Sequence, residues 1–333
     1  MTVKVAINGF GRIGRNVLRA IVETERTDIE VVAINDLGSV ETNAHLMQFD
    51  SVHGRFPGRV KISGNTLDVG TGPIEVTAVR DPAELPWDGV DIALECTGFY
   101  TARDLASAHL ANGAKRVLIS APGANADKTI VFGVNHDTLT GSDIIVSNAS
   151  CTTNCLSPVA KVLNDAVGLK RGFMTTIHSY TGDQPTLDTA HSDLYRARAA
   201  AINMIPTSTG AARAVSHVLP ELAGKLDGVA IRVPTPNVSV VDLTFEATRK
   251  TTVDEINDAI RTAANGPLKN VLGYTDAPAV SMDFNHDPHS SIFHTDQTKI
   301  IDGNMCRILT WYDNEWGFSS RMADTAVAMG KLI

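Results

Sequence analysis

A glycine-rich turn near the start of this 333-residue chain constrains its fold more than any other feature. The turn has the pattern G-x-G-x-x-G at residues 9–14, follows the β-like segment 3–8 and opens an apolar repeat with helical spacing. A second β-like segment, 29–34, leads to Asp36. This pattern predicts a dinucleotide-binding Rossmann unit, because it combines a strand, a glycine turn, a helix, a second strand and a carboxylate about 20 residues beyond the turn.

The glycines and the carboxylate have separate physical roles in such a unit. Gly9, Gly11 and Gly14 permit a tight turn that brings backbone N–H groups close to a pyrophosphate at the helix start. We expect Asp36 to accept hydrogen bonds from the ribose hydroxyls of the adenosine half. Because the same carboxylate repels a ribose 2′-phosphate, the sequence favours NAD over NADP.

Short segments within residues 55–80 look like antiparallel strands that interrupt the alternation of strands and helices. The alternation resumes after residue 90 with two further apolar runs. Thr97, Gly98 and Ser120 therefore lie at the carboxyl ends of predicted strands, where open α/β sheets bind ligands. These residue types also form ordinary turns, so both interpretations stay open.

The second half of the chain groups its strands together instead of alternating them with helices. The β-like runs are 172–180, 229–233 and 238–245, and an amphipathic helix follows at 253–264. This grouping predicts an α+β unit with an antiparallel sheet and helices on one face. A stretch as long as that from Thr181 to about Thr209 is either functional or disordered, and its arginines and aromatics favour function.

The predicted chemistry centres on residues 150–155, Ser-Cys-Thr-Thr-Asn-Cys. This stretch follows a β-rich run and opens an apolar helical repeat, so Cys151 is expected at the first turn of a helix. The N–H groups and positive end of a helix lower the pKa of a thiol placed there. A small buried core residue is the alternative interpretation of Cys151. Cys155 lies one helical turn further along and is predicted to serve packing.

Composition argues against several classes of function. The formal net charge of −8 offers no basic surface for nucleic acid. The four cysteines lack zinc-type or disulfide spacing, so no metal site is expected. The sequence shows no apolar stretch long enough to span a membrane and no signal-peptide pattern at its start, which favours the cytoplasm.

Six blocks of the sequence, taken in order, resemble the phosphorylating glyceraldehyde-3-phosphate dehydrogenase family. The blocks are 7–15, 150–155, 178–181, 206–212, 232–235 and 311–317. The resemblance implies a Rossmann domain of residues 1–150 completed by a C-terminal helix at 316–333, and a catalytic domain of residues 151–315. It also implies a homotetramer built around the long loop at about 181–202.

The resemblance implies a role for each matching residue. Cys151 is the implied nucleophile and His178 its base. Arg12 and Ile13 are expected to cover the pyrophosphate, and Asn314 to hold the nicotinamide carboxamide. The full implied cofactor set is Gly9, Gly11, Arg12, Ile13, Gly14, Asp36, Arg80, Thr97, Gly98, Ser120 and Asn314. The implied phosphate-binding set is Thr181 and Arg232 for the substrate phosphate, Ser150, Thr209 and Gly210 for inorganic phosphate, and Arg196 between the two. Thr152 is a further implied substrate-binding residue.

The implied activity is oxidation and phosphorylation of D-glyceraldehyde 3-phosphate to 1,3-bisphosphoglycerate, with reduction of NAD. In this hypothesis the Cys151 thiolate attacks the aldehyde carbon to give a hemithioacetal, and His178 accepts a proton as this is oxidised to a thioester. Inorganic phosphate then takes the acyl group, which explains why two anion sites are implied.

Other functions stay open. Erythrose-4-phosphate dehydrogenase shares the cysteine and histidine, although the block 208–212 favours an enzyme with a phosphate acceptor site. A Cys-His acyl hydrolase would need no nicotinamide, and RNA binding by the nucleotide fold conflicts with the negative charge. Related semialdehyde dehydrogenases lack these blocks. Thr189 and Ala190 stand where NAD-specific members carry Leu-Pro, so weak use of NADP is also open.

Overall fold

The structure, a computed structural model, describes residues 2–333. Contacts divide the chain into unit 1, Met1–Ser150 with Ser319–Ile333, and unit 2, Cys151–Phe318. Within the described residues, none of the helices combines the length and apolar character that a membrane crossing requires.

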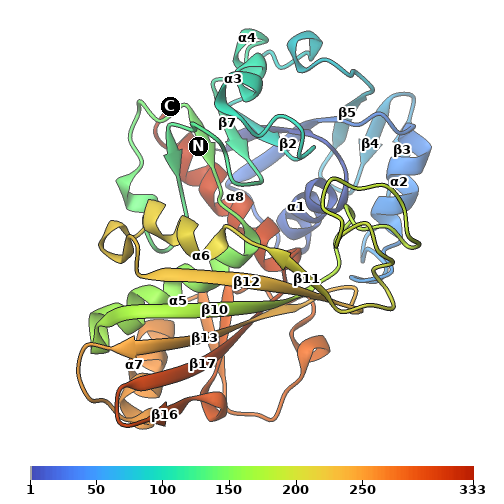
Figure 1. The fold of residues 1–333 in the computed structure, drawn as a ribbon. Helices are drawn as coiled ribbons and strands as arrows, with labels where there is room; N and C mark the ends of the chain where they lie inside the picture. Colours follow the sequence, from blue (N-terminus) through green and yellow to red (C-terminus); the bar gives the residue numbers. More distant parts are fainter. Residues whose placement is uncertain (1) are drawn as a thin grey trace. The chain divides into compact units, whose positions relative to one another are not determined.

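Unit 1 is built on a sheet that is parallel from β5 to β8 (Figure 1). The strands are β1 (Val3–Asn8), β2 (Ile29–Asn35), β3 (Lys61–Ser63), β4 (Thr66–Asp68), β5 (Pro73–Thr77), β6 (Ile92–Glu95), β7 (Arg116–Ile119), β8 (Lys128–Thr129) and β9 (Ile145–Ser147). The α-helices are α1 (Arg12–Glu23), α2 (Val40–Gln48), α3 (Arg103–Ala106), α4 (Ala108–Ala111) and α8 (Trp316–Gly330), whose first residues belong to unit 2.

The strand order of unit 1 is β3-β4-β5-β2-β1-β6-β7-β9-β8. Successive strands run outward from β1 in one direction and then from β6 in the other, so the order reverses between β1 and β6. Both strands are almost wholly buried, which explains their near-continuous apolar sequences. This arrangement confirms the Rossmann prediction, and the reversal marks the place where such sheets bind ligands.

The segments within 55–80 form β3, β4 and β5, and the first two pairings among them are antiparallel as expected. The expected interruption of the alternation of strands and helices is confirmed, because β3, β4 and β5 follow one another without a helix between them. β5 also pairs in parallel with β2, so these strands continue the same sheet.

Unit 2 contains a second sheet with the order β11-β12-β10-β13-β17-β15-β14, and β16 also pairs with β17. The strands are β10 (Leu169–Ser179), β11 (Ile205–Ser208), β12 (Leu226–Val233), β13 (Ser239–Ala247), β14 (Leu272–Thr275), β15 (Ser291–His294), β16 (Lys299–Ile301) and β17 (Met305–Tyr312). The α-helices that lie wholly in this unit are α5 (Cys151–Val167), α6 (Ala211–Ala214) and α7 (Val253–Asn265).

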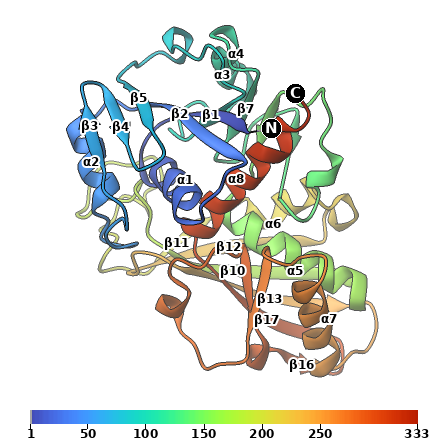
Figure 2. The ribbon, with the colours of Figure 1, turned by 180° about the vertical axis from the view of Figure 1, so that it is seen from behind.

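Helices α5 and α7 lie side by side over one face of this sheet (Figure 2), as the α+β prediction requires. The sheet is mixed rather than purely antiparallel. β10 pairs in parallel with β12, and β14 pairs in parallel with β15. The parallel pair β10–β12 has a consequence for the site, because it brings His178 and Arg232 into register as neighbours.

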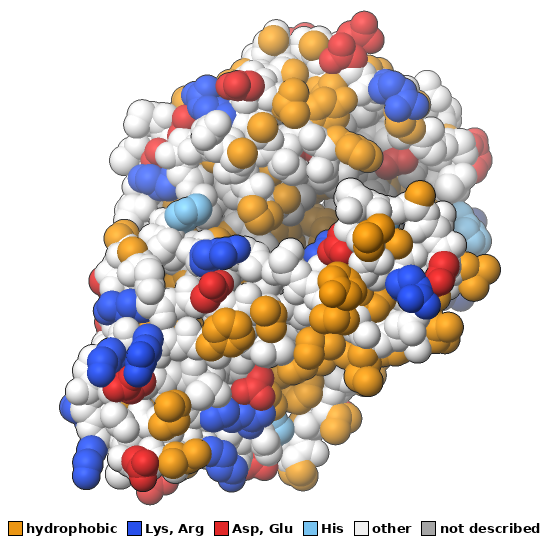
Figure 3. Space-filling view, in the orientation of Figure 1, with side chains coloured by type: hydrophobic (Ala, Val, Ile, Leu, Met, Phe, Trp, Pro, Cys, Tyr) orange, Lys and Arg blue, Asp and Glu red, His pale blue; other side chains and the backbone are white. Residues whose placement is uncertain are grey.

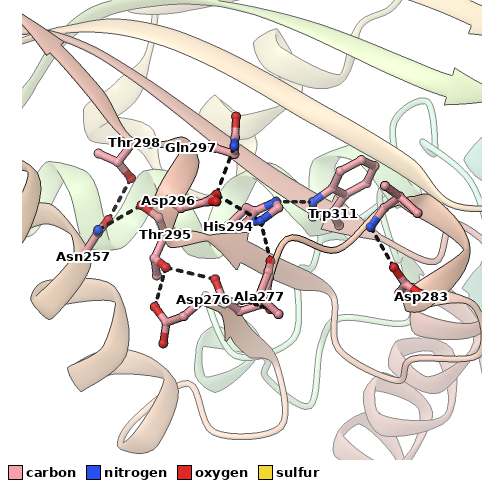
Figure 4. Close-up of polar contacts among 12 residues, drawn as sticks. Asn257, Asp276, Ala277, Asp283, His294, Thr295, Asp296, Gln297, Thr298 and Trp311 are labelled. Atoms are coloured by element: carbon pink, nitrogen blue, oxygen red, sulfur yellow. Dashed lines mark hydrogen bonds and ion pairs between the residues drawn. The ribbon is translucent and has the colours of Figure 1, made fainter.

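A polar cluster links α7 to the residues that follow β15, and links β15 to β17 (Figure 4). Trp311 Nε1 donates to His294 Nδ1 at 3.0 Å, and His294 Nε2 donates to the Ala277 carbonyl at 2.9 Å. Asn257 Nδ2 donates to the Thr295 carbonyl at 3.0 Å. These bonds satisfy polar groups that the fold removes from water, so the cluster serves the packing of this part of unit 2.

Candidate active site

A cavity of about 290 Å³ opens at the carboxyl ends of β1, β2 and β6 in unit 1. Its position coincides with the reversal of strand order, where a dinucleotide is expected. Its lining residues are Asn8, Gly9, Gly11, Asn35, Asp36, Leu37, Val79, Arg80, Cys96, Thr97, Phe99 and Tyr100.

The glycine turn has the geometry that a bound pyrophosphate needs. Gly9 has φ of +91°, and a Cβ there would lie 2.7 Å from the Thr97 backbone nitrogen. A Cβ at Gly14 would collide with the Gly9 carbonyl oxygen. At Gly11, the N-cap of α1, a Cβ would meet no atom within 4 Å, and no side chain caps the helix. Gly9 and Gly14 therefore allow close packing of the backbone, while Gly11 keeps space open in front of the helix N-terminus.

Asp36 faces the same cavity with its carboxylate held in place. Its Oδ2 accepts from the Phe10 backbone N–H at 2.9 Å, and its Oδ1 accepts from the Gly38 N–H at 2.8 Å. Each carboxylate oxygen can accept more than one hydrogen bond, so both can still receive a ribose hydroxyl. The residues of this cavity therefore fit a dinucleotide.

The predicted cofactor residues divide into two groups. Gly9, Gly11, Asp36, Arg80 and Thr97 line the cavity. Those outside its lining are Arg12, Ile13, Gly14, Gly98, Ser120 and Asn314. The sequence interpretation missed Asn8, Asn35, Leu37, Val79, Cys96, Phe99 and Tyr100. Asn8 and Asn35 end β1 and β2, and this strand-end position is a signal that could have identified them.

Arg12 makes an ion pair that the sequence did not indicate. Its guanidinium donates to Asp50 Oδ2 at 2.5 Å and to Oδ1 at 3.2 Å. Burial alone would raise the pKa of Asp50, but Arg12 and the N–H groups of His53 and Val52 lower it to about 2. The ion pair orients Arg12 at the first turn of α1, beside the glycine turn.

In unit 2 the fold brings Cys151 and His178 together. Cys151 is the first residue of α5, and His178 lies near the end of β10. The Cys151 Sγ atom is 3.5 Å from His178 Nε2. The turn leading to α5 includes Ala149 with φ of +57°, a left-handed conformation that costs a non-glycine residue about 1 kcal/mol or more.

The hydrogen bonds of His178 define its tautomer. Its Nδ1 lies 2.7 Å from the Ser179 carbonyl oxygen, which can only accept, so Nδ1 carries the proton. Burial lowers the pKa of His178 to about 3, and the positive charges of Arg232 and Arg196 add to this effect. The imidazole is therefore neutral near pH 7, and its Nε2 lone pair faces the Cys151 sulfur as a base would.

The pKa of the Cys151 thiol differs from the sequence prediction. Burial raises the pKa above its ordinary value. Backbone N–H groups at the start of α5 lower it, as predicted, and so do the charge of Arg232 and the Thr152 hydroxyl, but together they do not outweigh the burial. The other cysteines lie further from reactivity, because burial raises the pKa of Cys96 and Cys155 to about 12 and that of Cys306 to about 11.

Two guanidinium groups flank the thiol and imidazole. Arg232 donates from one terminal nitrogen to Thr181 Oγ1 at 2.8 Å and to the Ser179 carbonyl at 3.1 Å. Burial and the charge of Arg196 lower the pKa of Arg232, and its buried Nε makes no hydrogen bond within residues 2–333. A buried, unpaired donor beside a second cation is a site that favours an anion.

Arg196 is held within the long loop by acidic residues. It donates to Asp183 Oδ2 at 3.0 Å and to Thr207 Oγ1 at 3.1 Å, and Asp193 lies 3.7 Å from its Nε. Thr207 in turn donates to Asp193 at 2.8 Å. These contacts fix Arg196 in position, although a phosphate would have to share it with two carboxylates.

The remaining predicted phosphate residues are distributed around the start of α5. Thr153 Oγ1 donates to the Ala211 carbonyl at 3.4 Å, which links the first turn of α5 to α6. Thr209 Oγ1 accepts from the Ala211 N–H at 3.1 Å, and Gly210 is the N-cap of α6. The other two predicted substrate-binding residues, Thr152 and Ser150, differ in environment. The Thr152 hydroxyl is buried against the Tyr312 hydroxyl at 2.8 Å, and Ser150 directly precedes α5 and is partly exposed.

Asn314 is buried close to the same strands of unit 2. Its Oδ1 accepts from the hydroxyls of Ser179 and Ser239, both at 2.9 Å. Cys155 is fully buried with its sulfur 3.6 Å from Ser291 Oγ, an environment typical of packing. Within the described residues no three His, Cys, Asp or Glu side chains are arranged to hold a metal ion.

The fold and the site define a class: proteins that combine a Rossmann dinucleotide-binding unit with a cysteine–histidine pair beside an anion site. The family model described as the glyceraldehyde 3-phosphate dehydrogenase NAD binding domain matches residues 3–103, and that of the C-terminal domain matches residues 150–314. The chain belongs to the glyceraldehyde 3-phosphate dehydrogenase family.

Individual relatives match over their whole length. The glyceraldehyde-3-phosphate dehydrogenase of Cereibacter sphaeroides is 75% identical over 333 residues, and that of Xanthobacter flavus is 74% identical over 334 residues, with 100% of both chains covered in each case. Glyceraldehyde-3-phosphate dehydrogenase 1 of Bacillus subtilis is 55% identical over 334 residues, with 99% of both chains covered. Membership of this family makes the chain an oxidoreductase with NAD as its cofactor.

Proposed function

We propose that this protein oxidises and phosphorylates glyceraldehyde 3-phosphate with NAD, through a thioester on Cys151. The observation that carries the proposal is the pairing of the Cys151 sulfur with the unprotonated Nε2 of His178 at 3.5 Å. A thiol and a neutral base in this arrangement are the parts of a covalent nucleophilic mechanism.

The first steps use only these two residues. His178 Nε2 takes the Cys151 proton, and the sulfur forms a bond to the aldehyde carbon of the substrate. The imidazolium returns the proton to the new alkoxide, which gives a hemithioacetal and a neutral imidazole. NAD, when bound, supplies the two-electron acceptor for this carbon. His178 then holds the proton that leaves the hemithioacetal hydroxyl, and the product on Cys151 is a thioester.

The second half of the reaction is acyl transfer. An oxygen of inorganic phosphate attacks the thioester carbonyl, the carbon–sulfur bond breaks, and Cys151 leaves as a thiolate. The His178 imidazolium can stabilise or reprotonate that thiolate at 3.5 Å. The acyl group leaves as the mixed anhydride 1,3-bisphosphoglycerate, and the enzyme returns to its starting state.

Two anion sites are required by this sequence of steps. We assign the substrate phosphate to Arg232 and Thr181, because the buried Arg232 Nε has no partner within residues 2–333. We assign inorganic phosphate to the residues around the starts of α5 and α6, which are Ser150, Thr152, Thr209 and Gly210, with Arg196 between the two sites. For Thr152 this assignment concerns the backbone N–H, since its hydroxyl is bonded to Tyr312.

The assignment of NAD to the unit 1 cavity rests on the glycine turn and Asp36. The adenosine ribose is assigned to the Asp36 carboxylate, and the pyrophosphate to the open space in front of Gly11. A 2′-phosphate on that ribose would meet the Asp36 charge, which favours NAD over NADP. Thr189 and Ala190 in the long loop leave limited use of NADP within the proposal.

A homotetramer is part of the proposal. Apolar side chains are exposed along and just after the long loop, and Figure 3 shows orange side chains gathered in this region. The exposed fractions are 76% for Leu187, 82% for Leu194, 61% for Tyr195, 78% for Ile202 and 76% for Met204. Such a surface favours burial by another subunit. Sedimentation equilibrium would test the assembly, and a monomer at micromolar concentration would contradict it.

The cytoplasm is the compartment that fits this function. The cysteines, all within the described residues, are free thiols. Unpaired thiols, one of them assigned as the nucleophile, favour a reducing compartment.

The decisive experiment follows NADH absorbance with glyceraldehyde 3-phosphate in the presence and absence of inorganic phosphate or arsenate. We expect strong dependence on the anion, because the thioester needs an acceptor. Parallel assays use NADP and erythrose 4-phosphate. Phosphate-independent turnover, or preference for the tetrose, would transfer the assignment to erythrose-4-phosphate dehydrogenase, which shares the cysteine–histidine pair.

A further inference from the structure

A chain of buried hydrogen bonds lies directly behind the unit 1 cavity and ends on the carboxylate of Glu95. Glu95 is the last residue of β6 and is 1% exposed. In the sheet it pairs with Asn8, the last residue of β1, so it lies where the strand order reverses. No step proposed above uses this carboxylate.

Backbone groups define the direction of the hydrogen bonds on one side of Glu95. The Val79 N–H donates to Asn35 Oδ1 at 2.8 Å, and Asn35 Nδ2 donates to the Val79 carbonyl at 2.8 Å, so the Asn35 amide has one orientation. Asn35 Nδ2 also donates to Asn8 Oδ1 at 2.8 Å. This leaves Asn8 Nδ2 to donate to Glu95 Oε2 at 2.7 Å.

The indole group of Trp87 defines the direction of the hydrogen bonds on the other side of Glu95. Trp87 and His109 are both fully buried. Trp87 Nε1, which can only donate, lies 2.9 Å from His109 Nδ1, so that nitrogen carries no proton. The imidazole proton is therefore on Nε2, which donates to Glu95 Oε2 at 2.9 Å.

The second oxygen of Glu95 binds the turn after β6. Its Oε1 accepts from the Thr97 backbone N–H at 2.8 Å and from the Thr97 hydroxyl. Glu95 thus accepts at Oε2 from the side chains of Asn8 and His109 and at Oε1 from the Thr97 backbone N–H, and none of these three donors can reverse its direction. Asn8 and Thr97, which it holds, are both part of the cavity wall.

We propose that Glu95 is a positioning residue for NAD binding, which holds Asn8 and Thr97 in the cavity wall, with His109 and Trp87 fixing the direction of its hydrogen bonds. The inference rests on the proposed position of NAD in the unit 1 cavity. The Thr97 nitrogen that Glu95 holds is also the atom against which Gly9 packs, since a Cβ on Gly9 would lie 2.7 Å from it. Displacement of Thr97 would therefore move the glycine turn.

Glu95→Gln tests this inference because glutamine keeps the size of the side chain but replaces one acceptor oxygen by an NH₂ group. Either that group faces the donors of Asn8 and His109, or it faces the Thr97 N–H. In both cases part of the wall must move. We expect the Kd for NAD, measured by isothermal titration calorimetry on the full chain, to rise about tenfold.

Two measurements separate this effect from a general loss of structure. The rate of Cys151 alkylation by iodoacetamide without NAD reports on unit 2 and should stay as in the wild type. Glu75→Gln removes an exposed carboxylate from β5 of the same sheet and should leave the Kd unchanged. Thermal unfolding of each variant checks that the fold is retained.

His109 provides a second, independent test through a conservative replacement. In His109→Gln the amide can donate to Glu95 and accept from Trp87, so we expect a Kd within about twofold of the wild type. In His109→Leu the donor is lost, and the Kd should rise about tenfold. A residue that only fills space would not distinguish the polar from the apolar replacement in this way.

The outcomes distinguish this inference from the placement on which it rests. Wild-type affinity in folded Glu95→Gln, or equal affinities in the two His109 variants, would overturn the inference. Asp36→Asn, which changes the assigned ribose contact, is measured alongside. Loss of affinity with Asp36→Asn and not with Glu95→Gln overturns the Glu95 role alone. Unchanged affinity in both variants overturns the placement of NAD in this cavity as well. If Glu95→Gln does not fold, the His109 pair decides.

Discussion

The cavity of unit 1 and the thiol site of unit 2 are built from different parts of the polypeptide. The cavity uses the glycine turn, backbone groups and the ends of adjacent strands. The thiol site uses side chains from separate elements, with Cys151 on α5, His178 on β10 and Arg232 on β12. Single substitutions remove side chains but not backbone groups. They should therefore reduce reaction rate steeply in unit 2 and cofactor affinity more gently in unit 1.

The largest expected effect comes from Cys151→Ser. A serine hydroxyl beside a neutral imidazole is a far weaker nucleophile than a thiolate, so kcat/KM should fall at least ~10⁴-fold. The Kd for NAD should not change, because Asp36 and the glycine turn lie in the other unit. Cys155→Ser is the matched control, since that sulfur is buried against Ser291, and it should retain turnover. Substantial activity in Cys151→Ser would remove the covalent mechanism.

His178→Asn should have the next largest effect. Asparagine keeps a polar group near the Cys151 sulfur but cannot accept its proton, so kcat/KM should fall about 10²–10⁴-fold. Iodoacetamide alkylation of Cys151 at pH 7 should slow in parallel, because the thiolate then forms without its base. Stopped-flow NADH formation and alkylation rates measure the two effects. An unchanged alkylation rate would show that another group activates the thiol.

The same contrast explains which parts of the fold could be predicted from the sequence. The Rossmann unit follows from residues that are close in the chain, since the glycine turn and Asp36 need only two strands and one helix for their arrangement. The grouped strands likewise indicated α+β architecture. The parallel pairing of β10 with β12 was missed, because hydrophobic patterns do not encode the direction of a partner strand.

The site shows the same limit at the level of single residues. Cys151 and His178 were predicted by resemblance, and the structure adds their 3.5 Å separation and the tautomer set by the Ser179 carbonyl. The net pKa of Cys151 could not be predicted, because burial depends on everything packed around the sulfur. Nor could the bonds of Glu95 to Asn8 and His109, since these partners lie on separate segments of the chain. Long-range contacts of this kind leave no local pattern in the sequence.

A pair of glycine substitutions tests the backbone side of the comparison. Gly11→Ala places a methyl group in open space, so stability should change by less than about 0.5 kcal/mol, while the Kd for NAD rises roughly 10-fold or more because the methyl group occupies the approach to α1. Gly9→Ala forces a left-handed residue against Thr97 and should lower the free energy of unfolding by about 1–3 kcal/mol. Calorimetric binding and chemical denaturation separate the two results. Equal behaviour of both variants would contradict the division of roles within the turn.

Stability in mild acid gives a last comparison of the two units, because His178 in unit 2 and Asp50 in unit 1 titrate in different pH ranges. His178 has a pKa of about 3 in the folded protein and an ordinary value near 6.5 when unfolded. Between these values the unfolded chain binds the proton and the folded chain does not, so stability is present above pH 6.5 and is lost as the pH falls toward 3. Asp50 in unit 1, with a pKa of about 2, contributes stability that is lost only below its unfolded value of 3.8.

From pH 7 to pH 5 the His178 contribution should therefore dominate that of Asp50. The free energy of unfolding of the wild type should fall by about 2 kcal/mol more than that of His178→Asn over this range, because asparagine does not titrate. Urea denaturation at fixed protein concentration measures the difference. Parallel curves for the two proteins would mean that His178 accepts a proton readily in the folded state, and the neutral base assigned to the thiol site would then have to be reconsidered.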